Sequence, residues 1–155
     1  MSKRDKTRKK WVRNRNKAYL GSVEHFFREL YNGTTREAGF QVNKAKDVEG
    51  FGRVFDSNEF DISSIVKESE GGVRKELSFE DYFYVNYKNE PPSPNYRSGI
   101  RLGKGPEISK GGGQLSWFEM SQGVEKIEFE KSGYLINPLA FVLQGYWSFE
   151  KVADL

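Results

Sequence analysis

Apolar side chains between residues 11 and 31 recur on a 3.6-residue period, which predicts helical structure with one apolar face. Gly21 and Ser22 interrupt the pattern, so we expect two helices rather than one. Ser22 is a suitable N-cap for the second helix, and Asn32-Gly33 marks its end. The apolar face of this second helix is expected to lie against a sheet; it consists of Phe26, Phe27 and Leu30.

Alternating apolar and polar residues after a turn at 34–39 predict short strands at 40–42 and 51–55. Ile62, Ile65 and Val66 fit either a helical turn or a strand, and Gly71-Gly72 ends their segment. Further along, aromatic and β-branched residues predict strands more firmly, because these side chains suit a pleated, half-buried surface. The expected strands span residues 75–79, 82–87 and 114–120.

The last part of the chain combines a long loop, a hairpin and a short helix. Residues 88–113 contain four of the five prolines and six of the 16 glycines, a composition that predicts an irregular loop. Residues 124–130 and 134–144 are predicted to pair around a turn in which Gly133 is left-handed. Ser148 can cap a final helix at 149–155. Helices followed by antiparallel strands indicate an α+β fold, with N-terminal helices packed on a mostly antiparallel sheet.

Length and composition favour one folded unit. A chain of 155 residues can bury an independent core. Its 36% hydrophobic and 15% aromatic content is too high for a disordered protein. Charge divides the chain in two: residues 1–20 carry nine basic and one acidic side chain, or +8, and the other 135 carry 16 basic and 21 acidic, or −5. We therefore predict a basic, partly helical tail at 1–20 and a single domain at 21–155.

The basic tail has two interpretations. Its side chains, with Lys9, Lys10, Arg13 and Arg15 as the candidate anion-binding set, can bind the phosphates of nucleic acid or of anionic lipids. Alternatively, the tail is a solvated linker to an upstream domain. No membrane span is expected within the chain, because its longest apolar run, residues 139–143, is far short of the roughly 20 residues required.

Several catalytic chemistries are disfavoured by composition. The sequence has no Cys, which excludes disulfides, thiolate metal sites and Cys nucleophiles. His25 is the only histidine, so a Ser/His/acid set is a poor fit, and a second His for a zinc helix is missing. We expect His25 to be structural and the domain to be non-catalytic, with no cofactor or metal. An enzyme with paired carboxylates stays open, because the 22 acidic residues offer many pairs.

The aromatic residues supply the other candidate binding positions. Rings exposed on a sheet could stack on sugars or on bases, whereas rings packed beneath the helices would only build the core. The candidates for ligand binding are Tyr96, Trp117, Tyr146 and Trp147.

Two end motifs resemble a known family of bacterial envelope proteins. The first runs from Trp11 to Phe26 (W-x-x-N-R-x-x-A-Y-x-G-S-x-x-H-F), and the second is G-Y-W-S at 145–148, followed by A-D-L at 153–155. Residues 77–90 and 114–118 are similar to the central strands of that family, in the same order. The family is the C-terminal region of carboxypeptidase-like regulatory domain-containing proteins.

The resemblance implies an expectation about context rather than a reaction. Such proteins carry a signal peptide and a small regulatory β-sandwich before this region, and no peptidase activity is assigned to it. We therefore expect this chain to be one module of an exported protein, in the periplasm or outer membrane of a Gram-negative bacterium. Its expected role is to bind a glycan or a surface protein, and the alternative is a small nucleic-acid-binding protein that uses residues 1–20.

Overall fold

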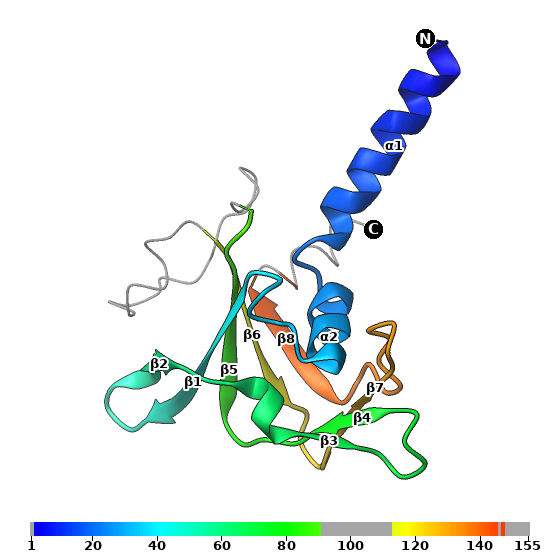
Figure 1. The fold of residues 1–155 in the computed structure, drawn as a ribbon. Coiled ribbons are helices and arrows are strands. Elements are labelled where there is room, and N and C mark those ends of the chain that lie inside the picture. Colours follow the sequence, from blue (N-terminus) through cyan, green and yellow to red (C-terminus); the bar gives the residue numbers. More distant parts are fainter. Residues whose placement is uncertain (1, 91–112, 146, 148–155) are drawn as a thin grey trace.

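The computed structural model describes residues 2–90, 113–145 and 147 (Figure 1). Two helices come first, α1 (Lys3–Tyr19) and α2 (Val23–Asn32), and strands follow. The predicted break at Gly21 and Ser22 is confirmed. The Ser22 hydroxyl accepts a hydrogen bond from the His25 amide at 3.2 Å, which caps α2.

The two helices differ sharply in burial. α1 begins at Lys3, behind a capping box made by Ser2 and Asp5, and none of its residues is buried. It extends away from the rest of the molecule, as Figure 1 shows. α2 buries one face and ends at Gly33, which has the left-handed conformation expected of a C-cap.

The strands form two antiparallel sheets. The larger sheet has the order β2-β1-β5-β6-β8 and is built from β1 (Phe40–Val48), β2 (Gly52–Glu59), β5 (Tyr82–Tyr87), β6 (Gln114–Met120) and β8 (Phe141–Gly145). The smaller sheet has the order β3-β4-β7 and is built from β3 (Val66–Glu68), β4 (Lys75–Leu77) and β7 (Ile127–Phe129). A short 3₁₀ helix, η1 (Ile62–Ile65), runs directly into β3, so the segment that fitted either a helical turn or a strand contains both.

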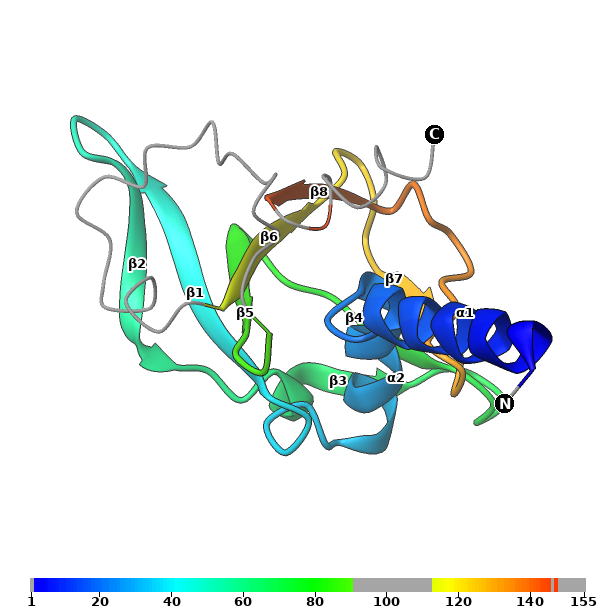
Figure 2. The same ribbon diagram turned by 90° about the horizontal axis from the view of Figure 1, so that it is seen from above.

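The main core lies between α2, one face of the larger sheet, and the smaller sheet (Figure 2). Phe26 packs on Phe40 with ring centroids 5.3 Å apart, and Phe27 packs on Phe129 at 5.1 Å. Each fully buried Phe contributes about 1.5–3 kcal/mol relative to an exposed one. The predicted α+β fold with N-terminal helices and antiparallel strands is confirmed. Of the two helices that were expected to pack on the sheet, α2 does so, whereas α1 buries no residue.

The predicted hairpin of residues 124–130 with 134–144 forms only beside its turn, where Phe129 and Leu135 form an antiparallel bridge and the Ile136 amide donates to the Glu128 carbonyl at 3.0 Å. The strands on either side pair elsewhere. β7 pairs with β4 in the smaller sheet, whereas β8 pairs with β6 in the larger one. The turn itself is as expected, because Gly133 has a φ of 89° and its amide donates to the Glu130 carbonyl. Between the two strands, Pro138 offers no amide, and the Asn137 side chain accepts from the Leu139 amide at 3.2 Å, so a ladder cannot continue. The predicted helix at 149–155 and most of the 88–113 loop lie outside the described residues.

A buried asparagine fixes an irregularity between β1 and β2. The register shifts between Asn43 and Ala45, and the Asn43 amide group donates to the carbonyls of Asp56 and Asn58, both at 3.1 Å. Asn43 is 1% exposed, so the donor side of these part-buried bonds is shielded from water. The β2 segment at residues 56–58 bulges as a result, which re-aims its side chains.

We expect Asn43→Ala to lower the free energy of unfolding by about 1–3 kcal/mol, because it removes the donor of both part-buried bonds. Urea denaturation measures the change. Asn58→Ala is the matched control, since that side chain is exposed, and it should change the stability by less than about 0.5 kcal/mol. Equal losses in the two variants would contradict this role for Asn43.

Candidate binding site

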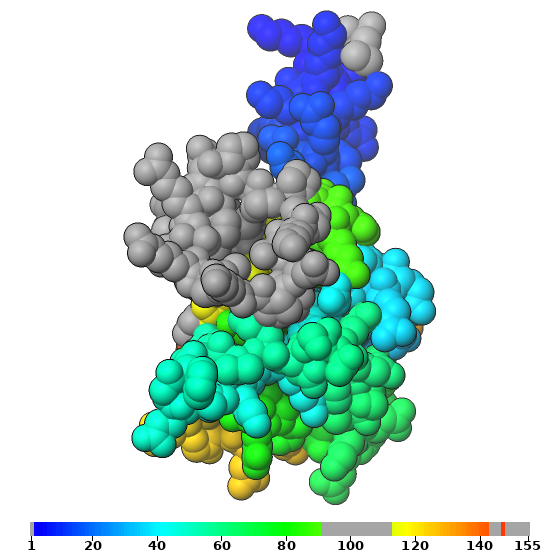
Figure 3. All heavy atoms as spheres, turned by 90° about the vertical axis from the view of Figure 1, so that its left-hand side faces the viewer, coloured from blue at the N-terminus to red at the C-terminus, as the bar shows by residue number. Residues whose placement is uncertain are grey.

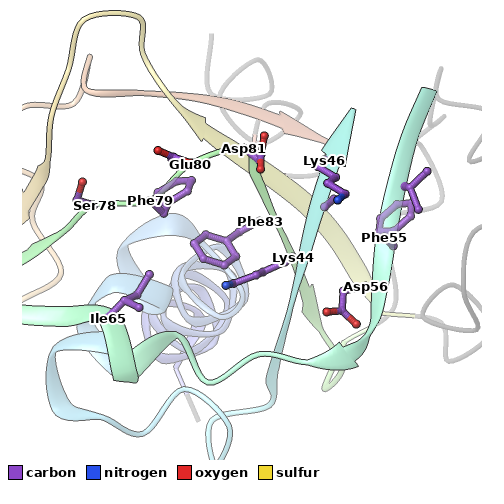
Figure 4. A pocket seen from close by; sticks show the side chains of 12 residues that line it. Lys44, Lys46, Phe55, Asp56, Ile65, Ser78, Phe79, Glu80, Asp81 and Phe83 are labelled. Atoms are coloured by element: carbon purple, nitrogen blue, oxygen red, sulfur yellow. The ribbon is translucent and has the colours of Figure 1, made fainter. Parts of the chain in front are cut away.

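A cavity of about 620 Å³ opens on the same face of the larger sheet as α2, beyond the end of the helix-covered core. Its walls are the β1–β2 hairpin, Ile65 of η1, and residues 78–83, which lead from β4 into β5 (Figure 4). A volume of this order is typical of sites for small ligands.

The alternation of β1 explains why a cavity forms here. Phe40, Val42, Lys44 and Lys46 occupy every second position of the strand and so point to the same face. The first two are buried in the main core, and the last two are exposed. On this face of β1 the apolar core therefore ends before Lys44. The Lys44 ammonium group lies 4.1 Å from the centroid of the Phe60 ring.

The rim of the cavity is polar and nearly balanced in charge. Lys44 and Lys46 supply two ammonium groups to the lining, and Asp56, Glu80 and Asp81 supply three carboxylates. The bulge set by Asn43 carries Asp56 to this edge. Asp81 has a φ of 63° and is the only non-glycine residue with a positive φ in the described part of the chain, a conformation that often accompanies functional positions.

The inner wall of the cavity is aromatic. Phe79 packs on Phe83 at 4.6 Å between ring centroids and edge-on to Phe118 at 5.2 Å. Phe83 and Phe118 are fully buried, whereas Phe79 is half-buried. A ligand in the cavity can therefore reach the half-buried ring of Phe79, which packs on Phe83, and also the half-buried ring of Phe55 on β2.

His25 takes no part in this cavity and is structural, as expected. Its Nδ1 atom accepts a hydrogen bond from the Gly21 amide at 3.0 Å, which requires an unprotonated Nδ1. Its Nε2 atom lies 3.8 Å from Glu29 Oε1. Burial lowers the pKa of His25; Arg28 adds to this effect and Glu29 opposes it.

We expect this arrangement to make stability depend on pH. Since the pKa of His25 is lower in the folded state than its ordinary value of 6.5, its contribution is complete above that value and is lost as the pH falls below it. In His25→Asn the side-chain oxygen can still accept the Gly21 hydrogen bond, but the titratable imidazole is gone. The difference in unfolding free energy between wild type and His25→Asn should be constant above about pH 7.5 and shrink towards pH 5. A difference independent of pH would contradict the assignment.

The structure places both described candidate tryptophans in the interior. Trp147 is 2% exposed, and its ring lies 5.4 Å from Phe26 and 5.9 Å from Phe118. Trp117 is 4% exposed and belongs to a small cluster on the opposite face of the larger sheet, together with Ala45 and Tyr84. Neither ring offers a free face for stacking, so packing is their role here. Tyr96 and Tyr146 lie outside the described residues.

The cluster on the opposite face also holds a cation. The Arg53 guanidinium lies 3.7 Å from the centroid of the Tyr82 ring and 5.8 Å from that of Trp117. The Tyr82 hydroxyl donates to Asp47 at 2.8 Å, and this hydrogen bond raises the pKa of Tyr82. Arg53 therefore covers the Tyr82 and Trp117 rings on this face of the larger sheet.

The candidate anion-binding residues all lie on α1 and all are exposed: Lys9, Lys10, Arg13 and Arg15. In the described ranges, no three His, Asp or Glu side chains lie close enough to hold a metal ion. None of the described helices is both long enough and apolar enough to cross a bilayer.

Sequence reasoning missed the cavity residues, although one signal pointed to them. Lys44 and Lys46 continue the apolar alternation of Phe40 and Val42 with charged side chains, which marks the place where the core ends. The contributions of Phe79 and Asp81 depend on how the segment after β4 returns to β5, and no local pattern shows that.

Comparison of the chain with protein-family models, with curated proteins and with solved structures gives no match. The family resemblance of the two end motifs therefore stays a prediction.

Proposed function

We propose that this chain is a non-catalytic binding module of an exported envelope protein and that it binds a glycan in the cavity between β1 and residues 78–83. The cavity is the observation that carries the proposal. Its volume of about 620 Å³ suits one or two sugar rings, whereas a folded protein partner would bind to a broad surface.

The chemistry of the cavity favours a neutral, hydroxyl-rich ligand. Carboxylates accept hydrogen bonds from hydroxyl groups and ammonium groups donate to them, so the mixed rim can hold several hydroxyls at once. Two ammonium groups against three carboxylates leave little net charge to attract a strongly ionic ligand. The half-buried ring of Phe79 offers an apolar surface for the C–H face of a sugar.

A binding role fits the groups available better than catalysis does. The single histidine, His25, is buried and accepts a hydrogen bond from the Gly21 amide, and the sequence has no Cys. A glycosidase with paired carboxylates is the enzymatic alternative, because Asp56, Glu80 and Asp81 share the rim. Release of reducing ends from a bound oligosaccharide would favour that alternative over simple binding.

The proposed context follows from the resemblance of the end motifs. An upstream regulatory β-sandwich would precede this chain in the parent protein, which would reside in the periplasm or outer membrane. A band of higher mass than 17.9 kDa in the envelope fraction, detected with an antibody to this chain, is the expected result of cell fractionation.

We expect Asp81→Asn to weaken glycan binding about tenfold without unfolding the protein, because Asn also tolerates positive φ. A glycan array probed with the labelled chain identifies the ligand, and calorimetry with that ligand measures the change in affinity. Glu70→Gln is the matched control, since it removes one negative charge from an exposed turn remote from the cavity.

Two results would overturn the site. One is an unchanged affinity in Asp81→Asn together with Phe79→Ala, measured on folded protein. The other is an array that shows no glycan bound by wild type under conditions in which thermal denaturation confirms the fold.

A further inference from the structure

Three of the four arginines of α1 lie on one side of the helix, and the fourth, Arg13, lies among the lysines on the other side. With 3.6 residues per turn, Arg4, Arg8, Trp11 and Arg15 fall within an arc of about 60° around the helix axis. Lys6, Lys10 and Lys17 fall within a similar arc on the other side. Lys3, Thr7 and Val12 flank the arginines and form one continuous stretch of surface with them and Trp11. We call this stretch the arginine face, defined by Arg4, Arg8, Trp11 and Arg15.

The arginine face is open to solvent along its whole length. Trp11 is 67% exposed, and no residue of α1 is buried. The helix projects beyond the rest of the described molecule (Figure 3). In the described part of the chain, no carboxylate forms an ion pair with Arg4, Arg8 or Arg15. An exposed indole between three guanidinium groups lacks any packing role inside the described fold.

These side chains match the parts of a single-stranded nucleic acid. The guanidinium fork binds phosphate oxygens in pairs, which an ammonium group cannot do. An indole ring stacks on an unpaired base, and such stacking is tolerant of sequence. Along the helix, the steps from Arg8 to Trp11 and from Trp11 to Arg15 are about 4.5 and 6 Å, so a base on the indole would keep its flanking phosphates near guanidinium groups.

Charge strengthens this match and argues against a membrane. Residues 1–20 carry +8, and α1 places like charges at i, i+4 in Arg4/Arg8, Lys6/Lys10 and Arg13/Lys17. Each such pair destabilises a helix by a few tenths of a kcal/mol, and bound phosphates would remove that repulsion. An interfacial membrane helix needs a broad apolar face, whereas α1 is basic nearly all round and exposes only Trp11 and Val12 as large apolar side chains.

We infer that the arginine face of α1 binds single-stranded nucleic acid, with Trp11 stacked on a base and the arginines on adjacent phosphates. The inference rests on α1 alone and is independent of the cavity.

Fluorescence anisotropy with the full chain and a labelled oligothymidylate of about 16 nucleotides tests it. We expect affinity to fall steeply with salt, and the Trp11→Ala variant to bind about tenfold more weakly. Quenching of indole emission on binding should vanish in that variant, because Trp117 and Trp147 are buried. The helical circular dichroism signal should rise when the oligonucleotide is added.

Charge-matched triple variants separate recognition from simple attraction. Changing Arg4, Arg8 and Arg15 to Lys keeps every charge and should still weaken binding several-fold, because the forks are lost. Changing Arg4, Arg8 and Arg15 to Gln should weaken binding more than changing Lys6, Lys10 and Lys17 to Gln, although both remove three charges.

The inference is overturned if the two Gln sets weaken binding equally and Trp11→Ala has no effect, since binding would then be non-specific. It is also overturned if dextran sulfate, a polyanion without bases, displaces the labelled oligonucleotide as well as unlabelled oligonucleotide does, and if Trp11→Ala weakens the binding of both competitors equally. Tighter binding to phosphatidylglycerol vesicles than to the oligonucleotide, or no binding to the oligonucleotide at low salt, would likewise overturn it.

Discussion

Replacing Trp147 with alanine is expected to lower the free energy of unfolding by about 3–5 kcal/mol. Its ring fills the space between Phe26 and Phe118, and its Nε1 atom donates to the Gly21 carbonyl at 2.9 Å. Its own amide donates to the Ser116 hydroxyl at 3.0 Å. The side chain therefore joins the end of the described chain to the junction between α1 and α2.

Urea denaturation of Trp147→Ala and Trp147→Phe separates packing from hydrogen bonding. Phenylalanine keeps much of the apolar contact and loses the indole donor, so it should cost about 1–3 kcal/mol. A loss below about 1 kcal/mol in the alanine variant would show that Trp147 does not close the core.

Gly21→Ala should lower the free energy of unfolding by about 2–5 kcal/mol for two separate reasons. Gly21 has a φ of 82°, and a residue with a Cβ pays about 1–2 kcal/mol there. A Cβ would also lie 2.5 Å from Gln114 Oε1 and 2.6 Å from Tyr87 Cδ1, and overpacking adds about 1–3 kcal/mol.

Gly50→Ala is the matched control for this substitution. Gly50 has a similar φ of 79°, but nothing lies within 4 Å of a Cβ there. Gly50→Ala should therefore lower the free energy of unfolding only by the cost of the positive φ, about 1–2 kcal/mol. Equal destabilisation of the two variants in thermal denaturation would mean that the close packing around Gly21 contributes nothing.

The network around Gly21 gives a physical meaning to the end motifs. Gly21 donates to His25 and accepts from Trp147, and the Ser22 hydroxyl caps α2. Residues 126 positions apart in the sequence are thereby joined at one point. These motif residues fix the entry of α2 and the return of the chain after β8, and this structural role accounts for the contacts that they make.

Local patterns predicted the elements that local forces determine. Both ends of α2 follow from Ser22 and Gly33, and the bounds of β5 and β6 match the aromatic and β-branched runs that predicted them. The β1–β2 hairpin is longer than expected, because its polar alternate positions hid the strand signal.

The sequence did not reveal which strands pair with each other. The turn at Gly133 was recognised, yet β7 and β8 join different sheets, since each strand is held by residues far along the chain. The same applies to the candidate site. Trp117 and Trp147 are buried and so are not ligand-binding candidates. The fold places Lys44 and Asp81, which are far apart in the sequence, in the lining of one cavity.

The central claim is that the ligand of this domain occupies the cavity beside β1. Backbone amide shifts in a ¹H–¹⁵N correlation spectrum, recorded while the tightest glycan from the array is titrated into the full chain, test it most directly. We expect the largest shifts at Lys44, Lys46, Phe79 and Asp81, with the signals of Arg53 and Tyr82 on the opposite face unchanged. Shifts confined to the opposite face or to α1, with the cavity signals unmoved, would contradict the account.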